Sequence, residues 1–269
     1  MIVTKLTGGL ANQMFQYAAG LALAKRLGTT LKIDLSWYET DEKRKFSLND
    51  FKISAKSASL LESFIIKNPP FGKTFNEPYF QFTPEFFNQK NNTYLNGYWQ
   101  SEKYFSDTVE TIRNEFTLKK KFEGKILRIA EMAKNTNSVS IHVRRSDYLQ
   151  KTDTYEILTP EYYKNAISKI SEAVENPKYF LFSDDINWIK KNVEYPKDSV
   201  IVSETGAKDY EELAIMSLCK HNVIANSSFS WWGAWLNSNN DKIVITPTKW
   251  FSTEIHDTKD LIPSNWLRL

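Results

Sequence analysis

The chain has one cysteine, Cys219, and three histidines among its 269 residues. A single thiol cannot form an internal disulfide, and it excludes a zinc site built from several cysteines. The histidines are His142, His221 and His256, which are far apart and belong to no H-x-x-x-H or H-E-x-x-H pattern. The sequence therefore predicts neither a disulfide framework nor a metal site.

Long apolar runs and a strong charge bias are missing as well. No stretch of about 18 apolar residues occurs, and residues 1–25 lack a basic segment followed by a long apolar run. We therefore expect a soluble, cytoplasmic protein and leave open a peripheral association with the inner membrane. The net charge of +3 is too small to indicate nucleic acid as a partner.

Aromatic residues, in contrast, make up 14% of the chain. Aromatic rings stack on the apolar faces of sugars as well as on each other. This content therefore favours a carbohydrate partner, although core packing is the commoner use of such residues.

Predicted strands and helices alternate along most of the chain, which indicates parallel, doubly wound α/β sheets. Residues 1–34 read as a first βαβ unit. The run Lys119–Lys121 breaks the pattern, so we place a solvated linker there and divide the chain into domains 1–120 and 121–269. In the second domain, strands are predicted at 138–143, 179–183, 199–202, 221–225 and 242–246.

Two adjacent arginines, Arg144 and Arg145, follow the predicted strand at 138–143. Ligands bind at the carboxyl ends of strands in open α/β sheets, and charges there are costly unless they are paired. A guanidinium group binds phosphate oxygens two at a time, so we predict that this pair holds a diphosphate. A structural ion-pair cluster that includes Asp147 is the alternative.

Polar groups follow two further strands of the same predicted sheet. A carboxylate at Asp184 or Asp185 could accept hydrogen bonds from the ring N–H and amino group of guanine, or the two could cap the next helix. Ser227 and Ser228 open a helix, where backbone N–H groups and hydroxyls form either an anion site or an ordinary helix cap. Together with the arginines, they favour a bound pyrophosphate.

In the first domain, glycines and amides meet at the start of a helix. Gly8 and Gly9 permit a tight turn and the close approach of a ligand, but their spacing is not the dinucleotide pattern G-x-G-x-x-G. Asn12 and Gln13 place amides at this helix start, and Gln100 lies at the carboxyl end of a predicted strand. Asn12 is either a ligand-binding residue or the helix cap.

These motifs, in this order, resemble those of the bacterial α-1,2-fucosyltransferases. The matching segments are Gly8–Ala18, His142–Tyr148, Phe182–Asp185, Asn226–Trp235, and the closing Pro247–Phe251 and Leu261–Trp266. The likeness covers nearly the whole chain. One small departure is Ala11, where the family often has glycine.

The resemblance implies a GT-B-like fold, in which two Rossmann-like domains face each other across a cleft. It implies that GDP-fucose binds the second domain and the acceptor the first. The expected reaction transfers L-fucose, with inversion, from GDP-β-L-fucose to the 2-hydroxyl of a terminal β-galactoside. The acceptor would be an oligosaccharide or glycolipid of O-antigen or capsule assembly.

The same resemblance implies roles for individual residues. Arg144 would bind the β-phosphate with support from Arg145, and His142 would contact the nucleoside. Asp184 or Asp185 would recognise guanine. The remaining positions are Ser227, Ser228 and Phe229 around the diphosphate, and Asn12 near the reacting centre. Gln13 and Gln100 are assigned to the acceptor side.

Transfer of this kind passes through an oxocarbenium-like state while negative charge grows on the departing GDP. No Asp-x-Asp triplet follows a predicted strand. Arg144 and the serine-rich helix start can supply fixed positive charge, so we expect no metal cofactor. Asp147 is the first candidate for the general base, with Glu102 and Glu211 as alternatives, but Asp147 is equally suited to orienting the arginines.

A non-catalytic nucleotide- or carbohydrate-binding module is the alternative function. Such a module would bind GDP without transferring a sugar to any galactoside.

Overall fold

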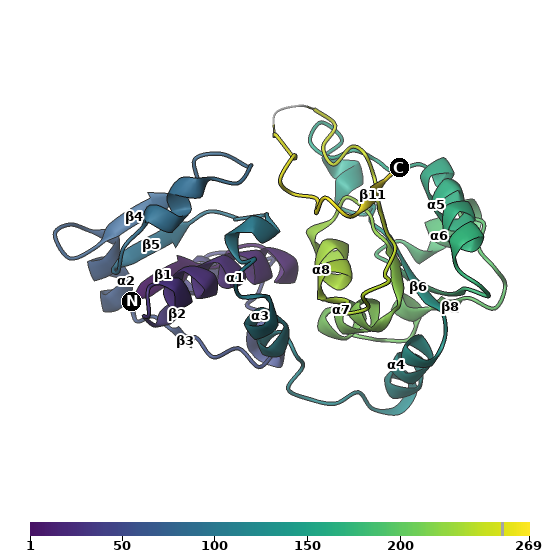
Figure 1. The fold of residues 1–269 in the computed structure, drawn as a ribbon, viewed down its shortest axis with the longest axis horizontal. Coiled ribbons are helices and arrows are strands. Elements are labelled where there is room, and N and C mark those ends of the chain that lie inside the picture. Colours follow the sequence, from purple (N-terminus) through teal and green to yellow (C-terminus); the bar gives the residue numbers. More distant parts are fainter. Residues whose placement is uncertain (254–255) are drawn as a thin grey trace. The chain divides into compact units, whose positions relative to one another are not determined.

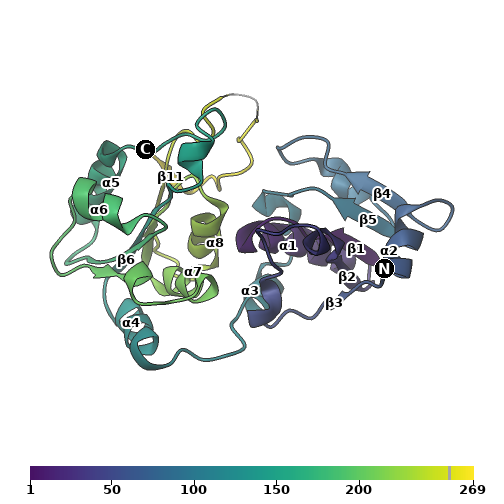
Figure 2. The ribbon, with the colours of Figure 1, turned by 180° about the vertical axis from the view of Figure 1, so that it is seen from behind.

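The computed structural model describes residues 1–253 and 256–269, which form two compact α/β units. One unit consists of Met1–Lys119 together with His256–Pro263, and the other of Lys120–Ile255 together with Ser264–Leu269. Each unit has its own parallel sheet with helices packed on it (Figures 1 and 2). The α/β class predicted from the sequence is therefore observed in both halves of the chain.

The sheet of the N-terminal unit has the strand order β3-β2-β1-β5-β4. Its strands are β1 (Ile2–Lys5), β2 (Leu31–Asp34), β3 (Lys56–Ser57), β4 (Lys73–Asn76) and β5 (Thr93–Asn96). Its α-helices are α1 (Leu10–Arg26), α2 (Leu60–Lys67) and α3 (Val109–Glu115). The two edge strands β3 and β4 were not predicted, because they are short and largely exposed and so carry no apolar alternation.

Helix α1 is buried along almost its whole length. Between Leu10 and Ala24 every residue is buried except Asn12. At Gly20 the helix lies so close to the sheet that an added Cβ would be 2.9 Å from the side chain of Leu31. This tight packing fixes the start of α1 at the carboxyl end of β1, with Asn12 as its accessible polar side chain.

The sheet of the C-terminal unit has the strand order β11-β10-β9-β6-β7-β8. Its strands are β6 (Ser138–Val143), β7 (Lys178–Ser183), β8 (Val200–Ile201), β9 (His221–Val223), β10 (Val244–Thr246) and β11 (Leu267–Arg268). Its α-helices are α4 (Gly124–Asn135), α5 (Pro160–Ala173), α6 (Ile186–Asn192), α7 (Asp209–Leu218) and α8 (Ser228–Leu236). Six short 3₁₀ helices also occur among the described residues of the two units, at Ser36–Glu39, Leu48–Asp50, Pro84–Asn88, Glu102–Tyr104, Tyr148–Gln150 and Val202–Glu204.

Strand β7 shows how the two faces of this sheet are covered. Successive side chains of a strand point to opposite faces. Tyr179 and Leu181 pack in one core with residues of α5 and α6, whereas Phe180 and Phe182 pack in a second core with residues of α4 and α7. The apolar run Tyr-Phe-Leu-Phe is thus buried on both sides, as expected for a central parallel strand.

The predicted second domain, 121–269, is wrong for one segment. Residues His256–Pro263 belong to the N-terminal unit. The Asp260 carboxylate accepts a hydrogen bond from the Phe82 backbone N–H at 3.1 Å and pairs with Lys103, and its carbonyl accepts from the Ser101 hydroxyl at 2.6 Å. Leu261 is buried beside these contacts. The chain therefore crosses back to the first unit before it ends in the second.

Candidate active site

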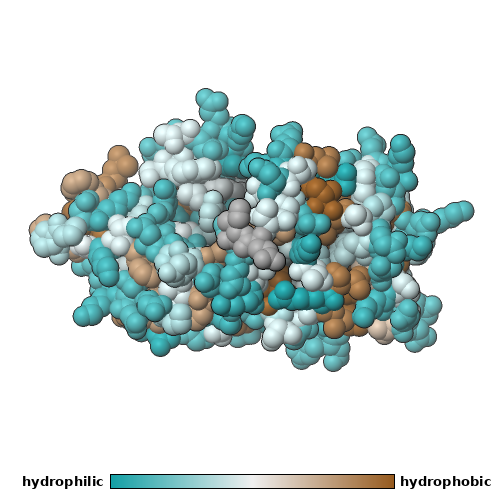
Figure 3. Space-filling model, turned by 90° about the horizontal axis from the view of Figure 1, so that it is seen from above, coloured by the Kyte–Doolittle hydropathy of each residue, from teal (hydrophilic) through white to brown (hydrophobic). Residues whose placement is uncertain are grey.

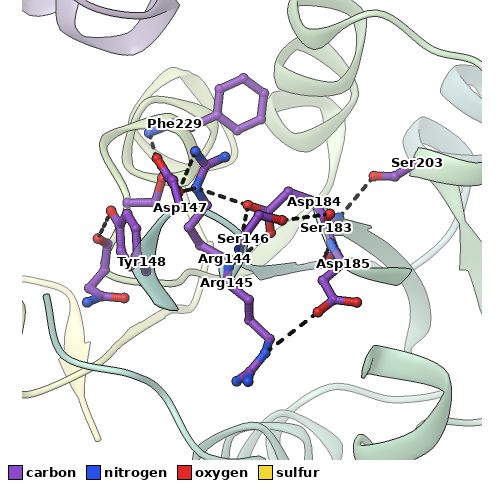
Figure 4. A network of polar contacts seen from close by, with 12 residues as sticks. Arg144, Arg145, Ser146, Asp147, Tyr148, Ser183, Asp184, Asp185, Ser203 and Phe229 are labelled. Carbon is purple, nitrogen blue, oxygen red and sulfur yellow. Dashed lines mark hydrogen bonds and ion pairs between the residues drawn. The ribbon is translucent and has the colours of Figure 1, made fainter. Parts of the chain in front are cut away.

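Arg144 leaves the carboxyl end of β6 between two carboxylates (Figure 4). Its Nε and Nη2 both lie 2.9 Å from Oδ1 of Asp147, and its Nε lies 3.3 Å from Oδ2 of Asp184. The ring of Tyr148 lies 5.8 Å from the guanidinium carbon. Among the described residues these contacts use Nε and Nη2, so the donors on Nη1 remain for a ligand.

Arg145 points the other way. Its guanidinium carbon lies 4.0 Å from the centre of the Trp188 ring on α6, and its Nε is 3.9 Å from the Asp185 carboxylate, which is too long for a hydrogen bond. Figure 4 shows the two arginine side chains on opposite sides of the strand end. The predicted guanidinium pair is therefore wrong in its geometry, because successive residues of an extended chain project in opposite directions.

Asp184 ties the arginine loop to the end of β7. Its two carboxylate oxygens accept the backbone N–H groups of Arg145 at 2.9 Å and Ser146 at 3.1 Å, and its carbonyl accepts from the Ser146 hydroxyl at 3.0 Å. Asp185 caps α6 by accepting the Trp188 backbone N–H at 3.0 Å. Both carboxylates are thus engaged within the protein, and recognition of guanine by either one stays a prediction.

His142 is buried in β6, two residues before Arg144. Burial, together with the positive charge of Arg144, lowers its pKa to about 3, so the imidazole is neutral at physiological pH. Its Nδ1 has no hydrogen-bond partner among the described residues, and its ring lies 5.7 Å from that of Phe229. A buried polar atom without a partner is uncommon, so this nitrogen is suited to contacting a ligand.

The start of α8 lies against the same loop. Ser227 caps the helix by accepting the Phe229 backbone N–H at 3.3 Å. The Asn226 side-chain amide donates to the carbonyls of Glu156 and Trp250, each at 2.8 Å. The backbone carbonyl of Asn226 accepts from the Tyr148 hydroxyl at 2.8 Å. These bonds hold the first turn of α8 next to the arginine loop.

The site therefore combines a guanidinium group with a helix N-terminus. The first N–H groups of a helix have no partner within the helix, and they carry the positive end of its dipole. At α8 the Phe229 N–H already donates to the Ser227 hydroxyl, so the helix start contributes chiefly the positive end of its dipole. The structure places Arg144, His142 and the start of α8 in one region at the carboxyl end of β6, and this arrangement is suited to an anion such as a diphosphate. Their binding of a diphosphate stays a prediction.

In the N-terminal unit, the structure brings together Asn12 and Gln100. The Gln100 amide donates to the Asn12 side-chain oxygen at 3.1 Å. Gly9, not Asn12, is the N-cap of α1, so Asn12 is not the helix cap. Gly8 has a φ of +72°, and an added Cβ there would be 2.9 Å from the Asn12 amide nitrogen. Glycine at this position therefore lets Asn12 lie against the turn.

The prediction that Gln13 lies on the acceptor side is wrong. The residue is fully buried, and its amide donates to the carbonyls of Gly8 at 3.0 Å and Lys45 at 2.9 Å. Its oxygen accepts the Ser47 backbone N–H at 2.8 Å. Gln13 thus anchors the segment after β2 and cannot reach a ligand, because its amide is fully used inside the unit.

Three carboxylates are candidates for the general base, and each has a different environment. Glu211 accepts the Lys208 backbone N–H at 2.9 Å at the start of α7, which is a helix-capping contact. Glu102 lies in the N-terminal unit, in the first turn of a 3₁₀ helix. Asp147 directs one carboxylate oxygen at two donors of Arg144, which favours the orienting role left open by its sequence.

Asp147 therefore offers a discriminating substitution. An asparagine keeps one oxygen that can accept from the Arg144 guanidinium, so we expect Asp147→Asn to retain transfer within about tenfold of the natural protein and Asp147→Ala to lose about 10²-fold. The measurement is kcat with each variant across pH 5–9. Equal, near-complete loss in both variants, with disappearance of the acid limb of the profile, would instead assign Asp147 as the base.

Two carboxylates that the sequence did not single out have perturbed acidity. Burial raises the pKa of Glu77 to about 7, even though the backbone N–H groups of Tyr98 and Trp99 donate to it at 2.6 and 2.9 Å. Burial likewise raises the pKa of Glu212 to about 7, against an opposing hydrogen bond from Ser203. These shifts arise from the folded environment, and no sequence pattern marks them.

Glu77 holds the turn that leads to Gln100. Trp99 has a φ of +56°, which is uncommon for a residue with a side chain. The Glu77 carboxylate accepts the backbone N–H groups of both Tyr98 and Trp99 at this turn. Gly97 lies against the same side chain, since an added Cβ would be 2.4 Å from the Cβ of Glu77. Glu77 is therefore a positioning residue for Gln100 and, through it, for Asn12.

The raised pKa of Glu77 predicts a pH-dependent stability. Between pH 4.5 and 7 the folded state keeps a proton that the unfolded state releases, so the free energy of unfolding falls as pH rises through this window. We expect the fall attributable to Glu77 to be about 2–3 kcal/mol, and to vanish in Glu77→Gln. Urea unfolding of both proteins at pH 5 and 8 measures it; identical pH dependences would contradict the assignment.

Residues 1–253 and 256–269 contain neither a metal-binding cluster nor a membrane-spanning helix. Within them, no three His, Cys, Asp or Glu side chains form a cluster that could hold a metal ion. None of their helices combines the length and the hydropathy needed to cross a bilayer.

Comparison with known families gives one full-length match. The model of glycosyl transferase family 11 matches residues 1–269. An α-1,2-colitosyltransferase of Escherichia coli is 34% identical over 288 residues, covering 100% of this chain and 99% of the relative. The O-antigen biosynthesis glycosyltransferase WbnK of Escherichia coli is 30% identical over 303 residues, covering 98% of this chain and 99% of the relative. Galactoside alpha-(1,2)-fucosyltransferase 1 of Ateles belzebuth is 26% identical over 161 residues, covering 53% of this chain and 42% of the relative.

Solved structures support the fold. FUT1 of Arabidopsis thaliana, solved as a point mutant in complex with GDP, has a TM-score of 0.52 at 10% identity. The match covers 97% of this chain and 74% of the Arabidopsis chain. The fucosyltransferase NodZ from Bradyrhizobium has a TM-score of 0.50 at 14% identity, covering 86% of this chain and 91% of that chain. These matches confirm the predicted GT-B-like class.

Proposed function

Because this chain belongs to glycosyl transferase family 11, we propose that it transfers L-fucose from GDP-β-L-fucose to the 2-hydroxyl of a terminal β-galactoside. The product is an α-1,2 linkage, and the anomeric centre is inverted. The activities of the relatives support this choice, since one is an α-1,2-colitosyltransferase and another a galactoside alpha-(1,2)-fucosyltransferase.

One observation carries the proposal: Arg144 follows the carboxyl end of β6, where the ring of the neighbouring His142 lies 5.7 Å from that of Phe229 in the first turn of α8. The carboxylates of Asp147 and Asp184 fix the guanidinium, and the Tyr148 hydroxyl binds the carbonyl of Asn226 just before the helix. Fixed positive charge of this kind stabilises negative charge without reorganising during the reaction. A departing diphosphate develops such charge.

The reaction balances as a single displacement. The bond between the anomeric carbon of fucose and the β-phosphate oxygen breaks, and its electrons remain on GDP. The galactose 2-oxygen bonds to the opposite face of the same carbon and gives its proton to a base. In this scheme Arg144 and the start of α8 hold the diphosphate, Arg145 orients the loop through Trp188, and His142 contacts the nucleoside as a neutral imidazole.

We assign the donor to the C-terminal unit and the acceptor to the N-terminal unit, where Asn12 and Gln100 share a hydrogen bond. The acceptor belongs to O-antigen assembly in this proposal, in keeping with the name of the Escherichia coli relative WbnK. A cytoplasmic location follows from the same assignment.

The direct test uses the purified chain with GDP-fucose and lactose. Mass spectrometry should show lactose gaining one deoxyhexose, and linkage analysis should place it on the galactose 2-hydroxyl. A nucleotide- or carbohydrate-binding module without catalysis would raise its melting temperature with GDP but leave lactose unchanged. That outcome would refute the transferase.

A second donor is favoured by a specific observation. The 34% identical, full-length relative is an α-1,2-colitosyltransferase, and colitose is L-fucose without its 3-hydroxyl. A site that hydrogen-bonds a hydroxyl discriminates strongly against an analogue that lacks it, whereas an apolar pocket discriminates weakly. The ratio of kcat/KM for GDP-fucose and GDP-colitose decides between the two donors.

Metal independence is a separate prediction. Because Arg144 and the start of α8 supply the positive charge, we expect that millimolar EDTA leaves the initial rate within about twofold of the untreated rate. Initial rates with EDTA and with added Mg²⁺ or Mn²⁺ measure this. A loss of activity that Mn²⁺ restores would show that a metal ion supplies the charge.

A further inference from the structure

Helix α2 in the N-terminal unit exposes most of its apolar side chains to solvent. Leu60, Leu61 and Phe64 are 73, 67 and 66% exposed, while Ser63 is only 4% exposed. A surface helix normally packs its apolar face on the core and turns its polar face to water. In α2 the core contact is made by Ser63 and Ile66, and the opposite face carries leucine and phenylalanine.

The loop after α2 extends this apolar face. Phe71 is 67% exposed. Gly72 lies directly against the helix, because an added Cβ would be 2.2 Å from the Ile66 carbonyl oxygen. The Gly72 N–H donates to the Asn68 carbonyl at 3.1 Å, and the Asn68 side chain donates to the Phe64 carbonyl at 2.7 Å. The loop is thereby held next to the end of α2.

Together these residues form what we call the α2 surface: Leu60, Leu61, Phe64, Ile65 and Phe71. They account for five of the eleven large hydrophobic side chains that are exposed in the described residues. Figure 3 shows hydrophobic side chains at the left end of the view, the end of the N-terminal unit that carries α2 and β4 in Figure 1. Concentrations of this kind on a soluble domain mark interaction sites.

The charges that flank the α2 surface are positive. Lys56 in β3 is exposed on the sheet face that α2 covers, since it lies beside Lys32, which pairs with Glu62 of α2. Lys73, at the start of the edge strand β4, is exposed two residues after Phe71. Neither lysine has an ion-pair partner among the residues that the structure describes. The one acidic residue of α2, Glu62, is paired with Lys32 and accepts the Ser59 backbone N–H at 2.8 Å. The α2 surface therefore joins apolar side chains to uncompensated lysines.

We propose that the α2 surface docks on an anionic lipid bilayer. Leucine and phenylalanine side chains on one face of a short helix bury into the headgroup boundary, and flanking lysines bind anionic headgroups. Self-association through the same face is disfavoured, because a two-fold contact would bring the lysines of two copies toward one another. Docking itself does not depend on the transfer reaction. The consequence that it brings the acceptor-side unit to glycolipid acceptors rests on the proposed function.

The test is co-sedimentation of the full chain with vesicles. We expect binding to vesicles of phosphatidylglycerol and phosphatidylcholine, at least about tenfold weaker binding to pure phosphatidylcholine, and weakening by salt, since each lysine contributes through the surface potential. Lys56→Gln combined with Lys73→Gln should reduce binding to the anionic vesicles and leave the residual binding to neutral vesicles unchanged.

Apolar insertion is tested by Leu61→Ser combined with Phe64→Ser. Both side chains are largely exposed, so the fold should be retained, while the partition coefficient should fall about tenfold or more. The matched control is Leu127→Ser combined with Met132→Ser on α4, where both side chains are 39% exposed, and it should bind as the natural chain does. Transfer to lactose without vesicles should be equal in all three proteins, which separates docking from the proposed function.

Four outcomes would overturn the proposal. The first is the absence of binding to anionic vesicles at low salt. The second is equal binding to anionic and neutral vesicles, and the third is an equal loss of binding in the α4 control. The fourth is a dimer in sedimentation velocity that the Leu61→Ser, Phe64→Ser variant abolishes, which would identify the α2 surface as a contact between copies of this chain.

Discussion

Replacing Arg144 by alanine is expected to lower kcat by about 10²–10³-fold while the chain stays folded. The guanidinium lies at the end of β6 with one quarter of its side chain exposed, and its contacts are to Asp147 and Asp184. Its removal takes away charge that matters most when the diphosphate departs. GDP should also raise the melting temperature of the natural protein by more than that of the variant.

Two further variants separate charge from geometry. Arg144→Lys keeps the charge but loses the planar fork, so we expect an intermediate rate. Arg145→Ala removes a guanidinium that packs on Trp188, so its effect should fall on stability more than on kcat. Near-normal turnover of Arg144→Ala would remove this residue from the reaction.

Among the variants proposed for this site, Asp184→Ala is expected to lower the free energy of unfolding most and also to lower the rate of transfer by about 10²-fold. The substitution leaves the N–H groups of Arg145 and Ser146 without their acceptor and Arg144 without one of its two carboxylates. Leaving such partly buried partners unpaired costs about 2–4 kcal/mol, which urea unfolding measures.

The alternative role for Asp184 predicts a different pattern. If its carboxylate recognises guanine, the substitution should raise KM for the donor and relax the preference for GDP over other nucleoside diphosphates, with unfolding little changed. Asp185→Asn tests the same role at the neighbouring position. There the expected loss is about 1 kcal/mol of stability from the α6 cap, without a change in donor KM.

The central elements of the C-terminal unit could be predicted because both their faces are buried. The bounds of β6 coincide with the strand predicted at 138–143, and α8 begins at Ser228, where a helix start was predicted. The edge strands β3, β4 and β11 could not, since they are short and exposed. The return of His256–Pro263 to the first unit depends on contacts of Asp260 with residues about 160 positions earlier, which no local pattern encodes.

The position of the candidate site in the fold could be predicted from the sequence, but the directions in which its side chains point could not. Strand ends identified Arg144, Asp184 and the start of α8, since polar residues cluster where parallel strands finish. Residue type alone did not reveal that Arg145 packs on Trp188 or that Gln13 is fully buried. The raised pKa of Glu77 was likewise out of reach, because burial by the turn after β5 causes it.

The most direct test of the central role of Arg144 is a crystal structure of the chain with GDP. We predict β-phosphate oxygens within hydrogen-bond distance of the Arg144 guanidinium and of the backbone N–H groups at the start of α8. A diphosphate bound away from both groups would contradict the account.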